Sequence, residues 1–291
     1  MATAEPLASL INTIQLTDVE IRHVSRNAAA EAERIVRSLE GSTGVGARVR
    51  SAQVSLAKLQ VEYWGDVNDA VRVGIGDAFD ASTEMQALFD RRLTTAAGIS
   101  PQYWKQSMLA QSRAGIDAFI AREEFNYKLS DRVYRNRALS QGTVKRTIDN
   151  GLLLGKGPYE IAKDVKRFID PATPGGASYA AMRLGRSEVN NAFHTNSVKG
   201  YQNTPWVARV KWNMSSSHGK ADECNEYAED LHWPTWGPGE YPPMDVPPKP
   251  HPNCLCYTTP VADDLETYVK NFHEGKYDDY INEQLGCSRV A

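Results

Sequence analysis

The segment from His218 to Cys256 constrains the fold of this chain more than any other. It reads HGKADECNEYAEDLHWPTWGPGEYPPMDVPPKPHPNCLC and contains three of the four cysteines and three of the six histidines. Eight prolines lie between Pro234 and Pro252. Each proline removes a backbone N–H and fixes φ, so neither a helix nor a central strand accommodates this composition. We therefore expect an irregular loop, and a loop this long needs something to hold it in place.

Cysteine and histidine side chains stand at both ends of this loop. Cys224 precedes the prolines, Cys254 and Cys256 follow them, and His218 and His251 lie alongside. Thiolate and imidazole are the ligands that zinc prefers, and a closed tetrahedral set stabilises a segment with no hydrophobic core of its own. The sequence therefore predicts a zinc site, and the favoured ligand set is the three cysteines with one of the two histidines.

Three other interpretations of these side chains stay open. The Cys-x-Cys spacing is tighter than the usual Cys-x-x-Cys, so the thiols are alternatively buried apolar groups beside exposed histidines. A disulfide from Cys224 to Cys254 or Cys256 is a second alternative. The third is a catalytic zinc, with Asp222 or Glu223 as the base, although the sequence has no His-Glu-x-x-His, Gly-x-Ser-x-Gly or phosphate-loop motif.

The overall composition is that of an ordinary core-forming chain. Hydrophobic residues make up 41%, charged residues 24%, and the formal net charge is -3, which favours neither nucleic acid nor membrane. No apolar run is long enough to span a bilayer, and no basic region precedes the short apolar patch at the N-terminus, which argues against a secretory signal. Cysteines clustered with histidines further indicate folding in a reducing compartment.

Amphipathic helical patterns fill the first half of the chain. We expect residues 1–15 to form a flexible arm or a strand. A capping box of Thr17 and Glu20 predicts the start of a helix that ends near Leu39. Further helices are predicted over 48–66, over 69–95 with a break at Gly74 and Gly76, and over 103–125. Because no strand pattern occurs here, residues 1–128 are predicted to form a helical bundle.

The middle of the chain is basic, with eleven Lys or Arg against four Asp or Glu in residues 132–186. Two short helices, from Thr143 to about Leu153 and from Glu160 to Phe168, are joined by a glycine-containing turn and predict a helical hairpin that packs on its neighbour. The alternative is a face presented to DNA. The candidate nucleic-acid-binding residues are Lys145, Arg146, Lys163, Lys166 and Arg167.

A long helix is predicted from Tyr179 to about Tyr201, followed by strands over 206–213 and 256–261 that would pair into a small antiparallel sheet. The helix carries a candidate polar cluster of Arg183, Arg186, Glu188 and Asn190. We interpret these residues as tethers to a neighbouring loop or sheet, with a catalytic cluster as the alternative. The predicted fold class is mainly α with a small α+β C-terminal part.

The last residues form an acidic tail. Residues 261–291 hold seven acidic side chains against three basic ones, with aromatic residues interspersed. We expect this tail to pack or dock, and we expect Cys287 within it to be a free thiol.

Several of these features together resemble a known family. They are the run AAMRLGRSEVNNAFHTNSVKGY, Lys211-Trp212 in a strand, Cys224, Gly-Pro-Gly-Glu-Tyr-Pro at 237–242 and His-Pro-Asn-Cys-Leu-Cys at 251–256. Their order and spacing resemble those of the phage Mu F-like minor capsid, or head morphogenesis, proteins over roughly residues 129–261. Two positions depart from the family pattern: Tyr227 stands where many members have the second cysteine of a Cys-x-x-Cys, and Leu255 stands where arginine is usual.

The resemblance implies a minor capsid protein of a tailed phage rather than an enzyme. Such a protein would associate with the portal protein and the major capsid or scaffold in the head interior, and with DNA during packaging or ejection. It would occupy the host cytoplasm during assembly and need no membrane. The domains expected are 1–128 for portal or capsid docking, 129–262 as the Mu F-like part and 263–291 as the tail. A nucleic-acid-binding zinc module and a zinc hydrolase are the alternative functions.

Overall fold

The computed structural model of the chain describes residues 4–40, 45–96, 98–123, 128–216, 218–219, 221–231 and 235–285. These residues form two compact units, each made of segments that are distant in sequence. Unit 1 comprises Met1–Thr13, Ile75–Phe119 and Ser187–Ala291, and unit 2 comprises Ile14–Gly74 and Ile120–Arg186. The predicted boundaries at 128/129 and 262/263 divide the chain along its sequence rather than by packing, and they stay predictions.

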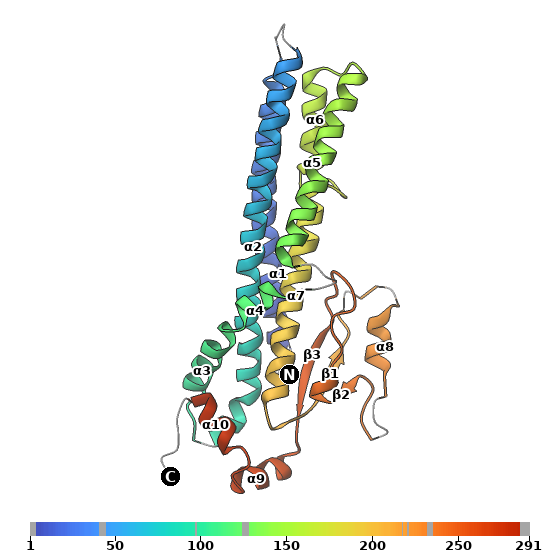
Figure 1. The fold of residues 1–291 in the computed structure, drawn as a ribbon. Helices are drawn as coiled ribbons and strands as arrows, with labels where there is room; N and C mark the ends of the chain where they lie inside the picture. Colours follow the sequence, from blue (N-terminus) through green and yellow to red (C-terminus); the bar gives the residue numbers. More distant parts are fainter. Residues whose placement is uncertain are drawn as a thin grey trace. The chain divides into compact units, whose positions relative to one another are not determined.

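Helices dominate the described chain, and the predicted fold class, mainly α with a small C-terminal sheet, is confirmed (Figure 1). The helices are α1 (Ala4–Arg37), α2 (Val45–Ala96), α3 (Pro101–Arg113), α4 (Ile116–Ala121), α5 (Leu129–Leu153), α6 (Pro158–Ile169), α7 (Ala177–Asn203), α8 (Glu223–Glu229), α9 (Leu265–His273) and α10 (Asp278–Leu285), with a short 3-10 turn η1 (Pro243–Asp245).

A three-stranded antiparallel sheet in unit 1 has the order β2-β1-β3, with β1 (Val207–Asn213) in the centre, β2 (Glu240–Tyr241) on one side and β3 (Tyr257–Ala262) on the other. Alternation along β1 buries Val210 and Trp212, which explains why the period-two pattern predicted it. The strands predicted over 206–213 and 256–261 are confirmed. Strand β2 was not predicted, because two residues within Gly-Pro-Gly-Glu-Tyr-Pro carry no periodicity.

In unit 2, helices α5 and α6 form the predicted hairpin. The turn between them places Gly155 at a φ of 71°, and the amide of Lys156 donates to the carbonyl of Gly151 at 2.9 Å. A Cβ on Gly151 would lie 2.7 Å from Cγ1 of Ile161, so the missing side chain allows the two helices to approach closely. Lys166 of α6 pairs with Glu33 of α1 at 2.6 Å, which ties the hairpin to its neighbour.

Two predictions about the N-terminal helices are wrong. Helix α1 begins at Ala4, so the expected arm is helical from residue 4 onward, residues 1–3 lie outside the described residues, and Thr17 is an interior residue rather than an N-cap. Helix α2 runs unbroken from Val45 to Ala96, through the residues between 66 and 69 and through Gly74 and Gly76. A helical glycine costs about 1 kcal/mol relative to alanine, and the burial of the apolar face of α2 outweighs it. That face includes Val67, Val71, Ile75 and Phe79.

Two other predicted boundaries are also wrong. The helix expected over 103–125 divides at Ala114 and Gly115 into α3 and α4, and Phe125 lies outside the described residues. Ser100 caps α3, with Pro101 at the first helical position. The helix expected to start at Thr143 begins instead at Leu129, and the Thr143 hydroxyl donates to the carbonyl of Leu139 at 3.0 Å within the helix.

The core of unit 1 surrounds a buried carboxylate. Asp90 of α2 has no exposed surface and accepts hydrogen bonds from the indole N–H of Trp206 at 2.8 Å and of Trp104 at 3.2 Å. The side-chain amide of Gln86 donates to it at 3.2 Å. Burial raises the pKa of Asp90 from its ordinary value of 3.8 to about 7. One acid thus joins α2, α3 and the residue before β1.

The C-terminal helices α9 and α10 pack on this core. Tyr268 and Tyr277 are 5% and 3% exposed, and their rings lie edge-on to the Trp206 indole at 6.1 and 5.5 Å between centroids. The Tyr280 ring contacts Trp206 in the same way at 5.3 Å. The expectation that the acidic tail packs is therefore confirmed for residues 265–285. Cys287 lies outside the described residues.

Gly239 offers a sharp test of the sheet. Its φ is 72°, and a Cβ there would lie 2.8 Å from the carbonyl oxygen of Ala228. Gly239→Ala therefore combines an unfavourable backbone conformation with a clash against backbone, and we expect it to lower the free energy of unfolding by about 3 kcal/mol in urea titration. Gly155→Ala is the matched control: its φ is 71° but its Cβ would contact nothing within 4 Å, so about 1 kcal/mol is expected. Equal losses for both variants would contradict this.

Candidate metal centre

The N-terminal part of the site is built by the cap of helix α8. Asp222 is the N-cap, and its carboxylate accepts from the amide of Cys224 at 2.8 Å. The side chain of Asn225 returns the contact by accepting from the amide of Asp222 at 3.1 Å. This reciprocal capping fixes the first turn of α8 and places Cys224 there with no exposed surface. The prediction that the entire segment is irregular is wrong for residues 223–229.

The C-terminal part is a tight turn that leads into β3. Asn253 adopts a φ of 61°, a left-handed conformation that asparagine tolerates better than most residues. The amide of Cys254 donates to the carbonyl of His251 at 3.3 Å and closes the turn. Cys254 and Cys256 are 3% and 1% exposed. Two thiols are therefore buried directly before the strand that pairs with β1.

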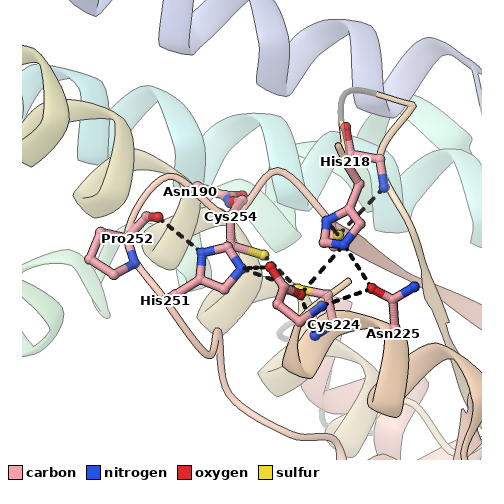
Figure 2. Close-up of polar contacts among 10 residues, drawn as sticks. Asn190, His218, Cys224, Asn225, His251, Pro252 and Cys254 are labelled. Atoms are coloured by element: carbon pink, nitrogen blue, oxygen red, sulfur yellow. Dashed lines mark hydrogen bonds and ion pairs between the residues drawn. The ribbon is translucent and has the colours of Figure 1, made fainter. Parts of the chain in front are cut away.

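The two parts meet at their sulfur and nitrogen atoms (Figure 2). The Sγ atoms of Cys224 and Cys254 are 3.4 Å apart, and Cys224 Sγ lies 3.6 Å from Nε2 of His251. Cys256 Sγ lies 3.9 Å from Nδ1 of His218. The potential ligand atoms form two triplets, His218–Cys224–Cys256 and Cys224–His251–Cys254, each within 4.8 Å, and Cys224 belongs to both. All five residues predicted as ligands are therefore brought together.

The separations within the Cys224–His251–Cys254 triplet are close to those around a tetrahedral ion. Zinc–sulfur and zinc–nitrogen bonds of about 2.3 and 2.05 Å at tetrahedral angles place two sulfurs about 3.8 Å apart, and a sulfur and a nitrogen about 3.6 Å apart. The Cys224–His251 distance of 3.6 Å matches this value, and the two thiols at 3.4 Å need only a small separation to fit it. Cys224, Cys254, Cys256, His251 and His218 together offer one donor more than a tetrahedral site requires.

Hydrogen bonds on the outer ring nitrogens orient both imidazoles. Nδ1 of His251 faces the carbonyl of Pro252 at 3.0 Å, and Nε2 of His218 faces the side-chain oxygen of Asn225 at 2.9 Å (Figure 2). For His218, the oxygen acceptor at Nε2 places a proton there, so in the neutral ring Nδ1 carries a lone pair toward the Cys256 thiol. For His251, Nε2 lies near both the Cys224 thiol and the Asp222 carboxylate. Oxygen partners of this kind commonly fix the histidine ligands of metals.

Asp222 contacts both rings. Its carboxylate lies 3.0 Å from Nε2 of His251 and 3.4 Å from Nε2 of His218. The same carboxylate caps α8, so the residue weighed as a catalytic base is already engaged in three local contacts. Glu223, its neighbour, stands in the first turn of α8, where an acidic side chain is favourable.

Burial and hydrogen bonding shift the pKa values of the three thiols in different directions. Desolvation raises the pKa of Cys224 to about 12. The hydrogen bond that Cys256 gives to Cys254 raises the pKa of Cys256 and lowers that of Cys254. Zinc binds thiolates, and the charge of a bound dication ionises coordinating thiols that would otherwise stay protonated. The three cysteines are free in the structure, and Cys224 and Cys254 are farther apart than the roughly 2.05 Å of a disulfide.

A small apolar core surrounds the sulfurs. Trp212 and Tyr241 are buried against the three cysteines, and Met214, Tyr227 and Val246 pack around them. Tyr227, which stands where many Mu F-like proteins have a cysteine, places its ring 5.2 Å from that of Trp212. Burial alone agrees with thiols that are apolar core groups. The two triplets of sulfur and imidazole nitrogen atoms that share Cys224 are the feature that favours a metal.

Helix α7 holds the proline-rich segment through its backbone. The Asn190 side chain donates to the carbonyl of Cys254, and the Ser187 hydroxyl accepts from the amide of Asn253 at 3.2 Å. One turn beyond, Nε2 of His194 faces the carbonyl of Pro247 at 3.0 Å. Burial lowers the pKa of His194 to about 3, so the ring is neutral and acts as a donor here. These hydrogen bonds tether the backbone of the proline-rich segment to α7, which is the role predicted for the polar residues of this helix.

The other members of the proposed polar cluster lie elsewhere. Arg186 makes a bidentate pair with Asp18 of α1, with contacts of 2.8 and 3.1 Å from its Nε. Glu188 is 2% exposed, and Arg183 is exposed. Ser187 and His194 are the residues that sequence reasoning did not select for this role. The available signal was helical spacing: Asn190 follows Ser187 by three residues and His194 follows Ser187 by seven, so all three lie on one face of the helix.

The basic candidates for nucleic-acid contact lie on α5 and α6. Two of them use their charge within the chain, because Lys145 pairs with Asp149 at 3.0 Å and Lys166 with Glu33 at 2.6 Å. Arg146 donates to the hydroxyl of Thr143 at 3.0 Å. Lys163 and Arg167 are exposed one helical turn apart on α6.

Comparison with known proteins identifies no relative: no family model matches the chain, and no characterised protein or solved structure matches it significantly. In the described part of the chain, every helix is too short or too polar to cross a bilayer.

The Asn190 tether can be tested through metal affinity. We expect Asn190→Ala to weaken zinc binding by about tenfold to a hundredfold, because partners that orient ligands contribute on this scale. Competition with a chromophoric chelator measures the effect. Asn203→Ala, at the exposed end of the same helix, is the control and should bind zinc like the wild type. An unchanged zinc affinity in Asn190→Ala would show that the turn at Cys254 keeps its conformation without the hydrogen bond from Asn190.

Proposed function

We propose that this protein is a non-enzymatic structural component of a tailed-phage head that docks through its N-terminal helices, in which a zinc ion fixes the shape of the proline-rich segment. The ion would be held by Cys224, Cys254 and Cys256 with His251 or His218. Zinc supplies no reaction in this proposal; it joins the first turn of α8 to the start of β3. The protein would act in the host cytoplasm during assembly and then in the virion, near the portal.

The convergence of thiols and imidazoles from both ends of the segment carries the proposal. A hydrolytic zinc keeps one coordination position open for water and needs a free base nearby. Here five donors lie in two triplets that share Cys224, and Asp222 is engaged by the α8 cap and by both imidazoles. This arrangement favours a closed structural site over the alternative of a zinc hydrolase.

The assembly role rests on the resemblance of residues 129–261 to the Mu F-like minor capsid proteins. The residues that carry the resemblance are also those that build the centre: the α7 run containing Asn190, the Lys211-Trp212 strand, Cys224 and the terminal His-Pro-Asn-Cys-Leu-Cys. Contacts with the portal protein, the major capsid protein or scaffold, and DNA during packaging or ejection belong to this proposal.

Co-expression with the portal protein of the same phage tests the role. We expect the wild-type chain to co-purify with the portal, and Cys224→Ser to reduce the recovered complex at least tenfold because the Mu F-like part loses the fixed shape of its proline-rich segment. Cys287→Ser is the control for the loss of a thiol and should leave the complex intact. If neither the wild-type chain nor Cys224→Ser co-purifies with the portal, the assembly role is contradicted. If the two co-purify in equal amounts, the role of the zinc-bound segment is contradicted.

Binding to nucleic acid is the second candidate, and the exposed pair Lys163 and Arg167 favours it. Substituting both with alanine should weaken binding to duplex DNA at low salt and make its dependence on salt shallower. Lys145→Ala is the comparison, because Lys145 already pairs with Asp149 and should contribute less. Binding that does not change with salt or with these substitutions would remove this candidate.

A further inference from the structure

A cavity of about 270 Å³ lies in unit 2, between the end of α1 and the start of α2. These two helix ends lie side by side at the top of Figure 1. Arg34 and Ser38 line the cavity from the α1 side, and Arg48, Ser51 and Ser55 line it from α2. Most of the surface that faces the cavity is polar, and no acidic side chain among the described residues lines it. The cavity therefore differs from an apolar gap between packed helices.

The polar residues of α2 that line this cavity have donors without partners. Arg48, Ser51 and Ser55 are all exposed, and their spacing of three and four residues places them on one face of the helix. Within the described residues, the Arg48 guanidinium makes no ion pair, and the hydroxyls of Ser51 and Ser55 make no hydrogen bond. Serines in helices often donate to a carbonyl of the preceding turn, as Ser25 does to Ile21 at 2.7 Å. The α2 donors are instead available to a ligand.

Arg34 lines the same cavity with part of its guanidinium in use. Its Nε and one terminal nitrogen donate to the carboxylate of Glu31 at 2.8 and 2.5 Å. This bidentate contact holds the guanidinium in place and leaves its second terminal nitrogen without a partner among the described residues. Because Glu31 offsets one of the two arginines, the group of Arg34, Arg48 and Glu31 keeps one net positive charge. The Ser38 hydroxyl already donates to the carbonyl of Ile35 at 2.6 Å, so we do not count it as a donor.

The chemistry of the ligand follows from these donors. Guanidinium groups and hydroxyls, beside a helix start with no acidic side chain in its first turn, favour a negatively charged group that is rich in acceptor oxygens. Guanidinium matches the oxygens of phosphate in particular. The five heavy atoms of a phosphate group fill only part of about 270 Å³, since one water takes roughly 30 Å³, so the ligand has an organic part as well. We propose that this cavity binds a small phosphate monoester, whose phosphate is held by Arg34, Arg48 and the hydroxyls of Ser51 and Ser55.

Two simpler interpretations compete with this assignment. Exposed arginines attract any anion weakly, and the phosphodiester backbone of a nucleic acid also presents phosphate oxygens. Methyl phosphate and dimethyl phosphate separate these cases, because above a second pKa of about 6 the monoester carries nearly two negative charges and the diester carries one. We expect a phosphorus NMR titration of the full-length protein, at about pH 7.5 in phosphate-free buffer, to show saturable binding of methyl phosphate at least tenfold tighter than that of dimethyl phosphate.

Substitution of one arginine supplies the second arm. Arg48→Gln should weaken the binding of methyl phosphate at least tenfold, because the site loses a charge-assisted hydrogen bond. Arg50→Gln is the matched control: it removes the same charge from an exposed arginine that does not line the cavity, and it should bind methyl phosphate like the wild type. Both arginines are exposed, so neither substitution alters the core of unit 2.

Three results would overturn the proposal. Absence of saturable binding of methyl phosphate would show that the cavity is merely hydrated. Binding of dimethyl phosphate that is as tight or tighter would indicate a surface for phosphodiesters. Equal losses in Arg48→Gln and Arg50→Gln would indicate attraction to the overall positive charge of this end of α2 rather than a site.

Discussion

Protein purified without chelators is expected to contain about one zinc ion per chain, and Cys254→Ser is expected to bring that content close to zero. The structure gives the reason: Cys254 is within 3.4 Å of Cys224, and the two join the ends of a segment that contains eight prolines. Loss of the ion should lower the free energy of unfolding by roughly 3 kcal/mol or more, because zinc binding contributes directly to folding. Elemental analysis and urea unfolding measure the two effects.

Cys287→Ser controls for the chemistry of the substitution and should retain both zinc and stability. Removing zinc from the wild-type protein with a strong chelator should reproduce the stability of Cys254→Ser. The outcome that contradicts the account is a metal-free wild-type protein whose stability is indifferent to chelator. Thiol titration after mild oxidation would then separate the remaining alternatives, since a disulfide from Cys224 removes two free thiols and apolar burial removes none.

The second large effect concerns pH and the buried Asp90. Because its pKa rises from 3.8 to about 7, the folded protein holds a proton between these values that the unfolded chain has released. This contribution to stability is therefore fully present below about pH 4 and is lost as the pH rises toward 7. The difference in pKa corresponds to about 4 kcal/mol. Urea unfolding at intervals from pH 5 to pH 8 should show the free energy of unfolding falling as the pH rises, because Asp90 ionises in the folded protein.

Asp90→Asn isolates the contribution from that of other titrating groups. The amide keeps the shape but cannot ionise, and it leaves one of the Trp104 and Trp206 donors without an acceptor. The variant should be less stable than the wild type at pH 5, and the difference should shrink as the pH rises to 8. Asp66→Asn, on the exposed face of the same helix, controls for the change in net charge. A difference that stays constant with pH would show that Asp90 does not titrate in this range.

The candidate site was predictable from the sequence because its chemistry is local. Thiols and imidazoles have few stable arrangements when a proline-rich segment separates them, and the five residues singled out are those that converge. The capped turn around Asp222 was missed, because the aspartate-to-asparagine reciprocal cap departs from the usual glutamate or glutamine partner and stands next to the prolines. The choice of four ligands among five donors depends on where an ion sits, and residue types do not determine that.

Most of the helical fold was also predictable, whereas several boundaries were not. Glycine at 74 and 76 weakens a helix locally, but the continuous apolar face of α2 overrides that weakness through contacts that only the folded protein supplies. Packing of α9 and α10 on Trp206 was expected only in general terms, since aromatic residues in an acidic tail do not specify their partner. The carboxylate of Asp90 gave no signal in sequence, because its burial depends on indoles at 104 and 206.

The zinc K-edge X-ray absorption spectrum of the purified protein tests the central claim most directly. We predict a four-coordinate shell with three sulfurs at about 2.3 Å and one nitrogen at about 2.05 Å, and almost no zinc absorption from Cys224→Ser, as for Cys254→Ser. A shell of oxygen and nitrogen alone, or a spectrum that Cys224→Ser leaves unchanged, would contradict the claim that a metal joins the two ends of the proline-rich segment.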